Sequence, residues 1–167
     1  MRALVVYETM FGNTGQIATA IADGLADGAE VTITNVVDAP TEVPPGIDLL
    51  VVGGPTHAFS MSRASTRHTA AERGAPVTEA DGGIREWLEA LPTPEAPPVF
   101  AAFDTRVDMP LLPGAASRAA SKVARHNGFT VLHPASFLVK DYEGPLVKGQ
   151  LELARDWGHG LTEQLAG

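Results

Sequence analysis

Short, wholly apolar segments recur along the chain, and each is followed by a stretch with helical periodicity. Residues 4–7, 49–52 and 99–103 are three such segments. Strands of this composition are typically buried on both faces, as in the parallel sheets of α/β proteins. The alternation therefore predicts a parallel sheet with helices on both faces. In such sheets ligands bind outside the carboxyl ends of the strands, so the loops after the first, third and fourth strands are candidates for a site.

Two further strands and several helices complete the predicted pattern. An alternating segment at 31–34 predicts the second strand, and residues 129–139, interrupted at Pro134, predict the last one. Helices are predicted from apolar residues spaced three or four apart, in the segments 17–25, 64–73, 84–91, 115–126 and 147–165. No internal repeat and no second boundary is visible, so we expect residues 1–167 to form a single domain.

The absence of cysteine bounds the chemistry of this 167-residue chain. Disulfides, thiolate-bound iron–sulfur clusters and thiolate zinc sites are excluded. The five histidines are scattered and do not follow a metal-ligand spacing, so we expect no metal site. Any redox chemistry must therefore come from a bound cofactor.

The charge and hydropathy of the chain indicate its surroundings. A net charge of -8 disfavours nucleic acid and favours partners with basic surfaces. The first residues lack the pattern of a secretory signal, and no apolar run approaches the ~20 residues that span a bilayer. We expect a cytoplasmic protein without membrane insertion.

The loop after the first strand is suited to hold a phosphate. It reads Thr9-Met10-Phe11-Gly12-Asn13-Thr14 and leads into a helix. Neutral main-chain N–H groups around Gly12 and Asn13, with threonine hydroxyls, can donate to an anion at a helix start. The Gly-Lys-Ser/Thr ending of a nucleoside triphosphatase loop and the G-x-G-x-x-G dinucleotide spacing are both absent. A turn that only caps the helix is the alternative.

This loop resembles the Thr/Ser-x-Thr-Gly-x-Thr loop of the flavodoxin family, with Phe11 where the family usually has a hydroxyl. The resemblance spans nearly the whole chain, includes Glu143-Gly144-Pro145 before the last helix, and fits the short-chain type. It implies a flavodoxin-like three-layer α/β sandwich with a five-stranded parallel sheet of order 2-1-3-4-5. It also implies non-covalently bound flavin mononucleotide (FMN), with the phosphate held by Thr9, Met10, Phe11, Gly12, Asn13 and Thr14.

The loop after the third strand resembles the Pro-Thr-x-x-x-x-Met loop of flavodoxin-like quinone reductases. The resemblance implies that the isoalloxazine is lined by Pro55, Thr56, His57, Ala58 and Phe59. Phe59 either stacks on the ring, in place of a tryptophan common in flavodoxins, or is a buried anchor of the loop. His57 either lies beside the flavin, where it can tune the reduced state, or is exposed to solvent.

The loop after the fourth strand is Asp104-Thr105-Arg106, which the resemblance places at the pyrimidine edge of the flavin. Arg106 either faces the ring edge or forms a surface ion pair with Asp104 or Asp108. No aromatic residue occurs between residues 104 and 114, where many flavodoxins have a tyrosine. The ring is then open on that side, or Leu111 or a partner covers it.

A basic group falls in the polar segment 60–83, whose role as lid, dimer contact or spacer the sequence leaves open. Its members are Arg63, Arg67, His68 and Arg73. The favoured interpretation is a solvated helical face balanced by Glu72 and Glu79. Alternatively, the group docks an acidic partner or approaches the phosphate of a second substrate.

Three functions are compatible with these loops. The first is an FMN electron-transfer protein without catalytic residues of its own, a monomer or homodimer that carries electrons between redox partner proteins. The second is an FMN-dependent NAD(P)H:quinone, or other acceptor, oxidoreductase. The third is a partner-binding module that has lost the cofactor. A phospho-acceptor receiver domain is excluded, because Gly53 stands where its aspartate would follow the third strand.

Overall fold

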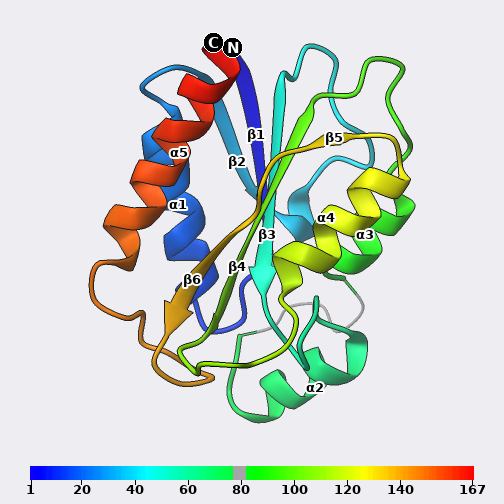
Figure 1. The fold of residues 1–167 in the computed structure, drawn as a ribbon. Helices are drawn as coiled ribbons and strands as arrows, with labels where there is room; N and C mark the ends of the chain where they lie inside the picture. The colour runs from blue at the N-terminus through cyan, green and yellow to red at the C-terminus, as the bar shows by residue number, and fades with distance from the viewer. Residues whose placement is uncertain (77–81) are drawn as a thin grey trace.

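The chain forms a three-layer α/β sandwich around one parallel sheet (Figure 1). The computed structural model describes residues 1–76 and 82–167. The strands run in the order β2-β1-β3-β4-β5, which confirms the predicted 2-1-3-4-5 order. The first four strands are β1 (Arg2–Tyr7), β2 (Glu30–Asn35), β3 (Leu49–Pro55) and β4 (Val99–Val107).

The last strand is broken into two pieces, as its proline predicts. Strand β5 (Thr130–Val131) and strand β6 (Ala135–Val139) each pair parallel with β4. Pro134 separates them, because proline lacks the N–H that a sheet hydrogen bond needs. Strand β6 pairs with residues 103–107, so it extends the edge of the sheet beside the carboxyl end of β4.

Helices cover both faces of the sheet (Figure 1). Helices α1 (Asn13–Leu25) and α5 (Gln150–Ala166) pack on one face, and α3 (Ile84–Ala90) and α4 (Ala116–His126) pack on the other. Helix α2 (Ala64–Glu72) confirms the predicted helical piece and lies beyond the carboxyl ends of the strands. A short 3₁₀ turn, η1 (Val36–Asp38), follows β2. Among the helices of the described residues, none combines the length and apolarity needed to cross a membrane.

The apolar strands bury alternate side chains in two separate cores. Leu4 and Leu50 face the core under α3 and α4, whereas Val5 and Val51 face the core under α1 and α5. Successive side chains of a strand point to opposite faces, so a strand covered on both sides needs apolar residues at every position. This requirement explains the continuous apolar runs in the sequence.

Helices α1 and α5 approach each other closely through two glycines. A Cβ added at Gly24 would overlap the carbonyl oxygen of Arg155, and one added at Gly158 would overlap that of Ile21. We expect Gly24→Ala or Gly158→Ala to lower the free energy of unfolding by about 1–3 kcal/mol, because backbone must shift to admit the methyl group. Gly160→Ala is the control, since that position in α5 has open space.

The control is expected to be neutral or to stabilise the protein by up to about 1 kcal/mol, because alanine favours helix over glycine. Urea unfolding of the three variants measures the difference. Equal effects at all three positions would contradict the close helix contact.

Candidate functional site

A cavity lies at the carboxyl ends of β1, β3 and β4, where the three predicted loops meet. The loop between β6 and α5 forms a fourth wall. The lining residues are Thr9, Met10, Phe11, Asn13, Thr14, Pro55, Thr56, His57, Thr105, Arg106, Val107, Val139 and Tyr142. Of the residues predicted for a cofactor site, the structure leaves Gly12, Ala58, Phe59 and Asp104 outside this lining.

The first loop is shaped by the side chain of Thr9. Its Oγ1 accepts hydrogen bonds from the N–H of Gly12 at 3.1 Å and of Gly15 at 3.3 Å. Gly12 has a φ of 92°, in the left-handed region that favours glycine. The Gly12 amide is therefore already used within the loop.

Two other main-chain amides at the start of α1 have no such partner. The N–H groups of Asn13 and Thr14 lie in the first helical turn, where no intrahelical acceptor exists. Within residues 1–76 and 82–167, no group accepts a hydrogen bond from either amide. Their side chains are engaged: Asn13 Nδ2 donates to the Glu143 carbonyl at 3.1 Å, and the hydroxyls of Thr14 and Thr105 lie 2.7 Å apart. The amides are thus held in place and offer two neutral donors at the positive end of a helix dipole.

The second loop is a tight turn that separates His57 from Phe59. The N–H of His57 donates to the Ser60 carbonyl at 2.8 Å, and the N–H of Ser60 returns to the His57 carbonyl at 3.0 Å. The two central residues, Ala58 and Phe59, both have positive φ. His57 is 5% exposed and Phe59 is 55% exposed, so the alternatives of an exposed His57 and a buried Phe59 anchor are both wrong. Phe59 does not line the cavity, so the structure does not place it as a stacking surface.

The predicted third loop, residues 104–106, is wrong as a loop: these residues belong to β4 (Val99–Val107), because β3 and β6 extend the sheet beside them. Their side chains lie in two places. Asp104 is fully buried under α4, where its Oδ2 accepts the N–H of Ser117 at 2.9 Å, and burial raises its pKa. Thr105 and Arg106 line the cavity. Arg106 donates from Nη2 to the Leu112 carbonyl at 3.0 Å, and no carboxylate of the described residues pairs with it. The alternative of a surface ion pair for Arg106 is therefore wrong.

Three cavity residues were not predicted from the sequence, Val107, Val139 and Tyr142, and Tyr142 is the aromatic one. Its ring centroid lies 5.6 Å from that of Phe11 and 5.4 Å from that of His57. The guanidinium carbon of Arg73 stands 4.9 Å from the same ring. The resemblance places a tyrosine between residues 104 and 114, a range that does not include Tyr142. The available signal was the position of Tyr142 directly before Glu143-Gly144-Pro145.

In this conformation Tyr142 nearly closes the cavity. The remaining volume is about 30 Å³, enough for one or two water molecules. A planar ring system needs more room than this, so a lining side chain must move to admit one, and we expect it to be Tyr142, which contacts Phe11 and His57. Because Tyr142 lies on the loop before α5 and is partly exposed, this movement leaves the sheet and the amides of α1 in place. The donor set therefore fits a phosphate-bearing planar ligand once this one side chain rotates.

The environment of His57 keeps its imidazole neutral at pH 7. Burial, aided by the charge of Arg67, lowers the pKa of His57 from 6.5 to about 4. A histidine with a depressed pKa in the folded state stabilises the fold above pH 6.5, and this contribution is lost as the pH falls toward 4. We expect the wild-type protein to lose about 3 kcal/mol more than His57→Gln between these pH values. Urea unfolding at several pH values measures this difference, and parallel pH profiles would contradict it.

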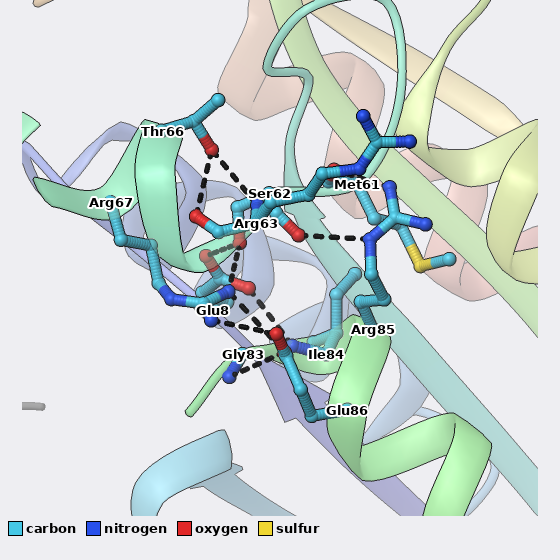
Figure 2. Close-up of polar contacts among 10 residues, drawn as sticks. All are labelled: Glu8, Met61, Ser62, Arg63, Thr66, Arg67, Gly83, Ile84, Arg85 and Glu86. Carbon is cyan, nitrogen blue, oxygen red and sulfur yellow. Dashed lines mark hydrogen bonds and ion pairs between the residues drawn. The ribbon is translucent and has the colours of Figure 1, made fainter. Parts of the chain in front are cut away.

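Arg67 does not lie on a solvated face, and this corrects the favoured interpretation of the basic group (Figure 2). Its side chain is 1% exposed, and Nη2 forms an ion pair with Glu86 Oε1 at 2.7 Å. Its Nη1 donates to Ser62 Oγ at 2.9 Å. Of the remaining members, Arg63, His68 and Arg73 are exposed. Glu79, one of the two balancing residues, lies outside the described residues.

The network around Arg67 reaches the first loop through Glu8 (Figure 2). Glu8 directly follows β1 and precedes Thr9. Its carboxylate accepts two hydrogen bonds, one from the hydroxyl of Ser62 and one from the N–H of Ile84 at 2.9 Å. Burial raises the pKa of Glu8, and its hydrogen bonds and Arg67 oppose that effect. The network joins α2, α3 and the strand that carries the first loop.

Solved structures with this fold match the chain over nearly its whole length. A flavodoxin from the domain Archaea is 22% identical, with a TM-score of 0.70 and all of both chains covered (100% of each). Flavodoxin 1 from Bacillus cereus is 14% identical, with a TM-score of 0.70 and 98% of each chain covered. A Fusobacterium nucleatum flavodoxin bound to flavin mononucleotide is 11% identical, with a TM-score of 0.59, covering 99% of this chain and 98% of that one.

No protein-family model and no curated protein sequence matches this chain. The structural neighbours nevertheless agree with the observed sheet order and helix layers. The class defined by the architecture is therefore an α/β protein with the flavodoxin-like fold, as the loop resemblance predicts.

Proposed function

We propose that this protein binds FMN non-covalently at the cavity and transfers electrons through it between redox partners. The observation that carries the proposal is the pair of unpartnered amides, Asn13 and Thr14, at the start of α1. They stand beside a cavity walled by His57 and Tyr142 at the carboxyl edge of the sheet. A neighbour with the same fold is described as bound to flavin mononucleotide, which supports this ligand.

The chain would hold the two ends of FMN with different groups. The amides of Asn13 and Thr14 would take the phosphate, and the Thr14–Thr105 hydroxyl contact joins the start of α1 to β4. His57 and Tyr142 would flank the ring and exclude water from it. Bound FMN would supply the capacity to accept and donate electrons, and the protein would position the ring and adjust its potential.

The absorbance spectrum of the purified protein, before and after anaerobic reduction, tests this proposal. We expect flavin bands that bleach on reduction, either directly or after FMN is added to the flavin-free chain. A colourless protein that does not quench FMN fluorescence would overturn the proposal and favour a partner-binding module without cofactor.

The surface charge bears on the protein partners of such a carrier. A net charge of -8 supports redox partners with basic docking surfaces, which meet acidic proteins faster at low salt. For a cytoplasmic electron carrier, we expect the rate of electron exchange with such a partner to fall as ionic strength rises. Stopped-flow measurements across a salt series would detect this, and a rate independent of salt would argue against a basic docking surface.

A second candidate is an FMN-dependent NAD(P)H:quinone, or other acceptor, oxidoreductase. It is favoured by a second cavity that shares Thr56, His57 and Tyr142 with the first. Such a cavity gives a small molecule a place beside the flavin. Anaerobic stopped-flow mixing of the FMN-loaded protein with NADH and, separately, with NADPH tests this function. If neither nucleotide bleaches the flavin, this function is ruled out.

A further inference from the structure

A second cavity of about 240 Å³ opens between α2, the turn after β3 and Tyr142. It shares Thr56, His57 and Tyr142 with the first cavity, so the two are neighbours. Pockets that enclose drug-sized ligands are typically about 300–1,000 Å³. This one therefore has room for the charged group of a small molecule, with the rest of that molecule directed toward the first cavity or solvent.

Arg73 supplies a cation to the wall of the second cavity. Its guanidinium carbon lies 4.9 Å from the Tyr142 ring centroid, and no carboxylate in the described part of the chain pairs with it. The neighbouring Glu72 instead contacts His68, with Oε1 3.3 Å from Nε2. The ring contact uses one face of the guanidinium, so its N–H groups remain available to an anion in the cavity.

Two neutral donors, Thr56 and His57, line the same cavity as Arg73. His57 is 5% exposed, and its Nδ1 has no hydrogen-bond partner. A neutral imidazole can donate one hydrogen bond. The Thr56 hydroxyl accepts the N–H of Ala116 at 3.1 Å and keeps its own proton for another acceptor. A cation and two polar side chains thus converge from α2 and the turn after β3.

The helix that precedes Arg73 is anchored by the buried network of Arg67 (Figure 2). Arg67 belongs to the same helix, α2, and its guanidinium is held by Ser62 and Glu86. Arg73 directly follows that helix, and its N–H donates to the Thr69 and Ala70 carbonyls at 3.2 and 3.1 Å. The arginine is therefore presented from an anchored helix and not from a free loop.

We propose that the second cavity is an anion-binding subsite for a small-molecule electron donor or acceptor that carries a phosphate or carboxylate group. Arg73 provides the charge, and Thr56 and His57 provide hydrogen bonds. The redox role of this ligand rests on the proposed FMN function, whereas anion binding at Arg73 does not.

Nitrogen-15 NMR of the FMN-loaded protein tests the subsite, because FMN then occupies the first phosphate position. Sodium phosphate and sodium benzoate are titrated separately at constant ionic strength, which distinguishes a phosphorylated from a carboxylated ligand. We expect saturable shifts at Arg73 Nε and at the His57 ring with at least one of the two anions. Arg73→Gln should raise the dissociation constant of that anion at least tenfold, and the dissociation constant of FMN should change less than twofold.

Arg63→Gln is the matched control. Arg63 is also exposed and directly precedes the same helix, and its hydrogen bonds, to Thr66 and Arg67, use only its main chain. The Arg63→Gln variant should bind the anion with the same affinity as the wild type. Non-saturable shifts, or equal affinities in the wild type and Arg73→Gln, would overturn the subsite.

The redox role is tested with NADPH, NADH and the uncharged 1-methyl-1,4-dihydronicotinamide as donors to the FMN-loaded protein. Arg73→Gln should lower the apparent affinity for a phosphate-bearing donor more than that for the uncharged one, and an equal effect on all three would contradict the role. If the chain retains no FMN, phosphate titration of the flavin-free protein still reports on Arg73. The two proposals can therefore fail separately.

Discussion

Replacing Asn13 with aspartate is expected to weaken FMN binding about a hundredfold or more while leaving the fold intact. The substitution sets a negative charge beside the two amides that would hold the phosphate, and like charges brought together cost several kcal/mol. A hundredfold loss corresponds to about 2.7 kcal/mol. An acidic residue in the first turn of a helix is favourable for the helix dipole, so the free energy of unfolding should change little.

Asn13→Ser separates the effect of charge from the loss of a hydrogen bond. Both variants lose the bond from Asn13 Nδ2 to the Glu143 carbonyl, but only aspartate adds a charge. We expect the serine variant to bind FMN within about tenfold of the wild type, since one hydrogen bond contributes about 1 kcal/mol. Fluorescence-quenching titrations and thermal unfolding of both variants give the comparison. Equal FMN affinities for the two would show that the phosphate lies elsewhere.

The second large effect is expected from Arg67→Met, which should lower the free energy of unfolding by about 3–5 kcal/mol. Methionine matches the length of the alkyl chain but leaves Glu86 without its cation and Ser62 without a donor. Glu8 also loses a neighbouring positive charge. The cost is expected mainly at Glu8, which is 3% exposed and stays desolvated without the nearby cation, whereas Glu86 is 39% exposed and is partly solvated.

Arg63→Met is the matched substitution on the exposed side of the same segment and should change stability by less than about 0.5 kcal/mol. Urea unfolding followed by circular dichroism measures both variants. If Arg67→Met unfolds within about 1 kcal/mol of the wild type, the network does not anchor α2. The proposed presentation of Arg73 would then lose its support.

The architecture was predictable because its signals are local. Continuous apolar runs at 49–52 and 99–103 require cover on both faces, and helices follow them in the sequence. The break at Pro134 and the helix at 64–72 could also be read from residue type and spacing. The loops could be placed together because parallel strands end at one edge of the sheet.

The burial of Arg67 could not be predicted, because its partners come from other elements. Helix α2 lacks an apolar stripe that would mark a buried face, and its basic residues look alike in the sequence. Only the fold brings Glu8, at the end of β1, and Glu86, in α3, to the same place as Arg67. Burial of a charged side chain is decided by such distant pairing and not by local pattern.

The details of the site depended on loop conformations that residue type does not reveal. Ala58 and Phe59 adopt positive φ without being glycine or asparagine, and this turn sends Phe59 outward. Tyr142 reaches the cavity from the loop before α5, far along the chain from the three predicted loops. The aromatic side chain of the cavity was therefore expected in the wrong segment, and the assignment of the phosphate to the first loop stays a prediction.

The most direct test of the account compares FMN with riboflavin, which has the same ring system but no phosphate. Each is titrated into the flavin-free protein and followed by fluorescence quenching and difference absorbance. If the amides of Asn13 and Thr14 hold the phosphate, FMN should bind with one-to-one stoichiometry and at least about a hundredfold more tightly than riboflavin. Equal affinities for the two flavins, or no binding of either, would contradict the account.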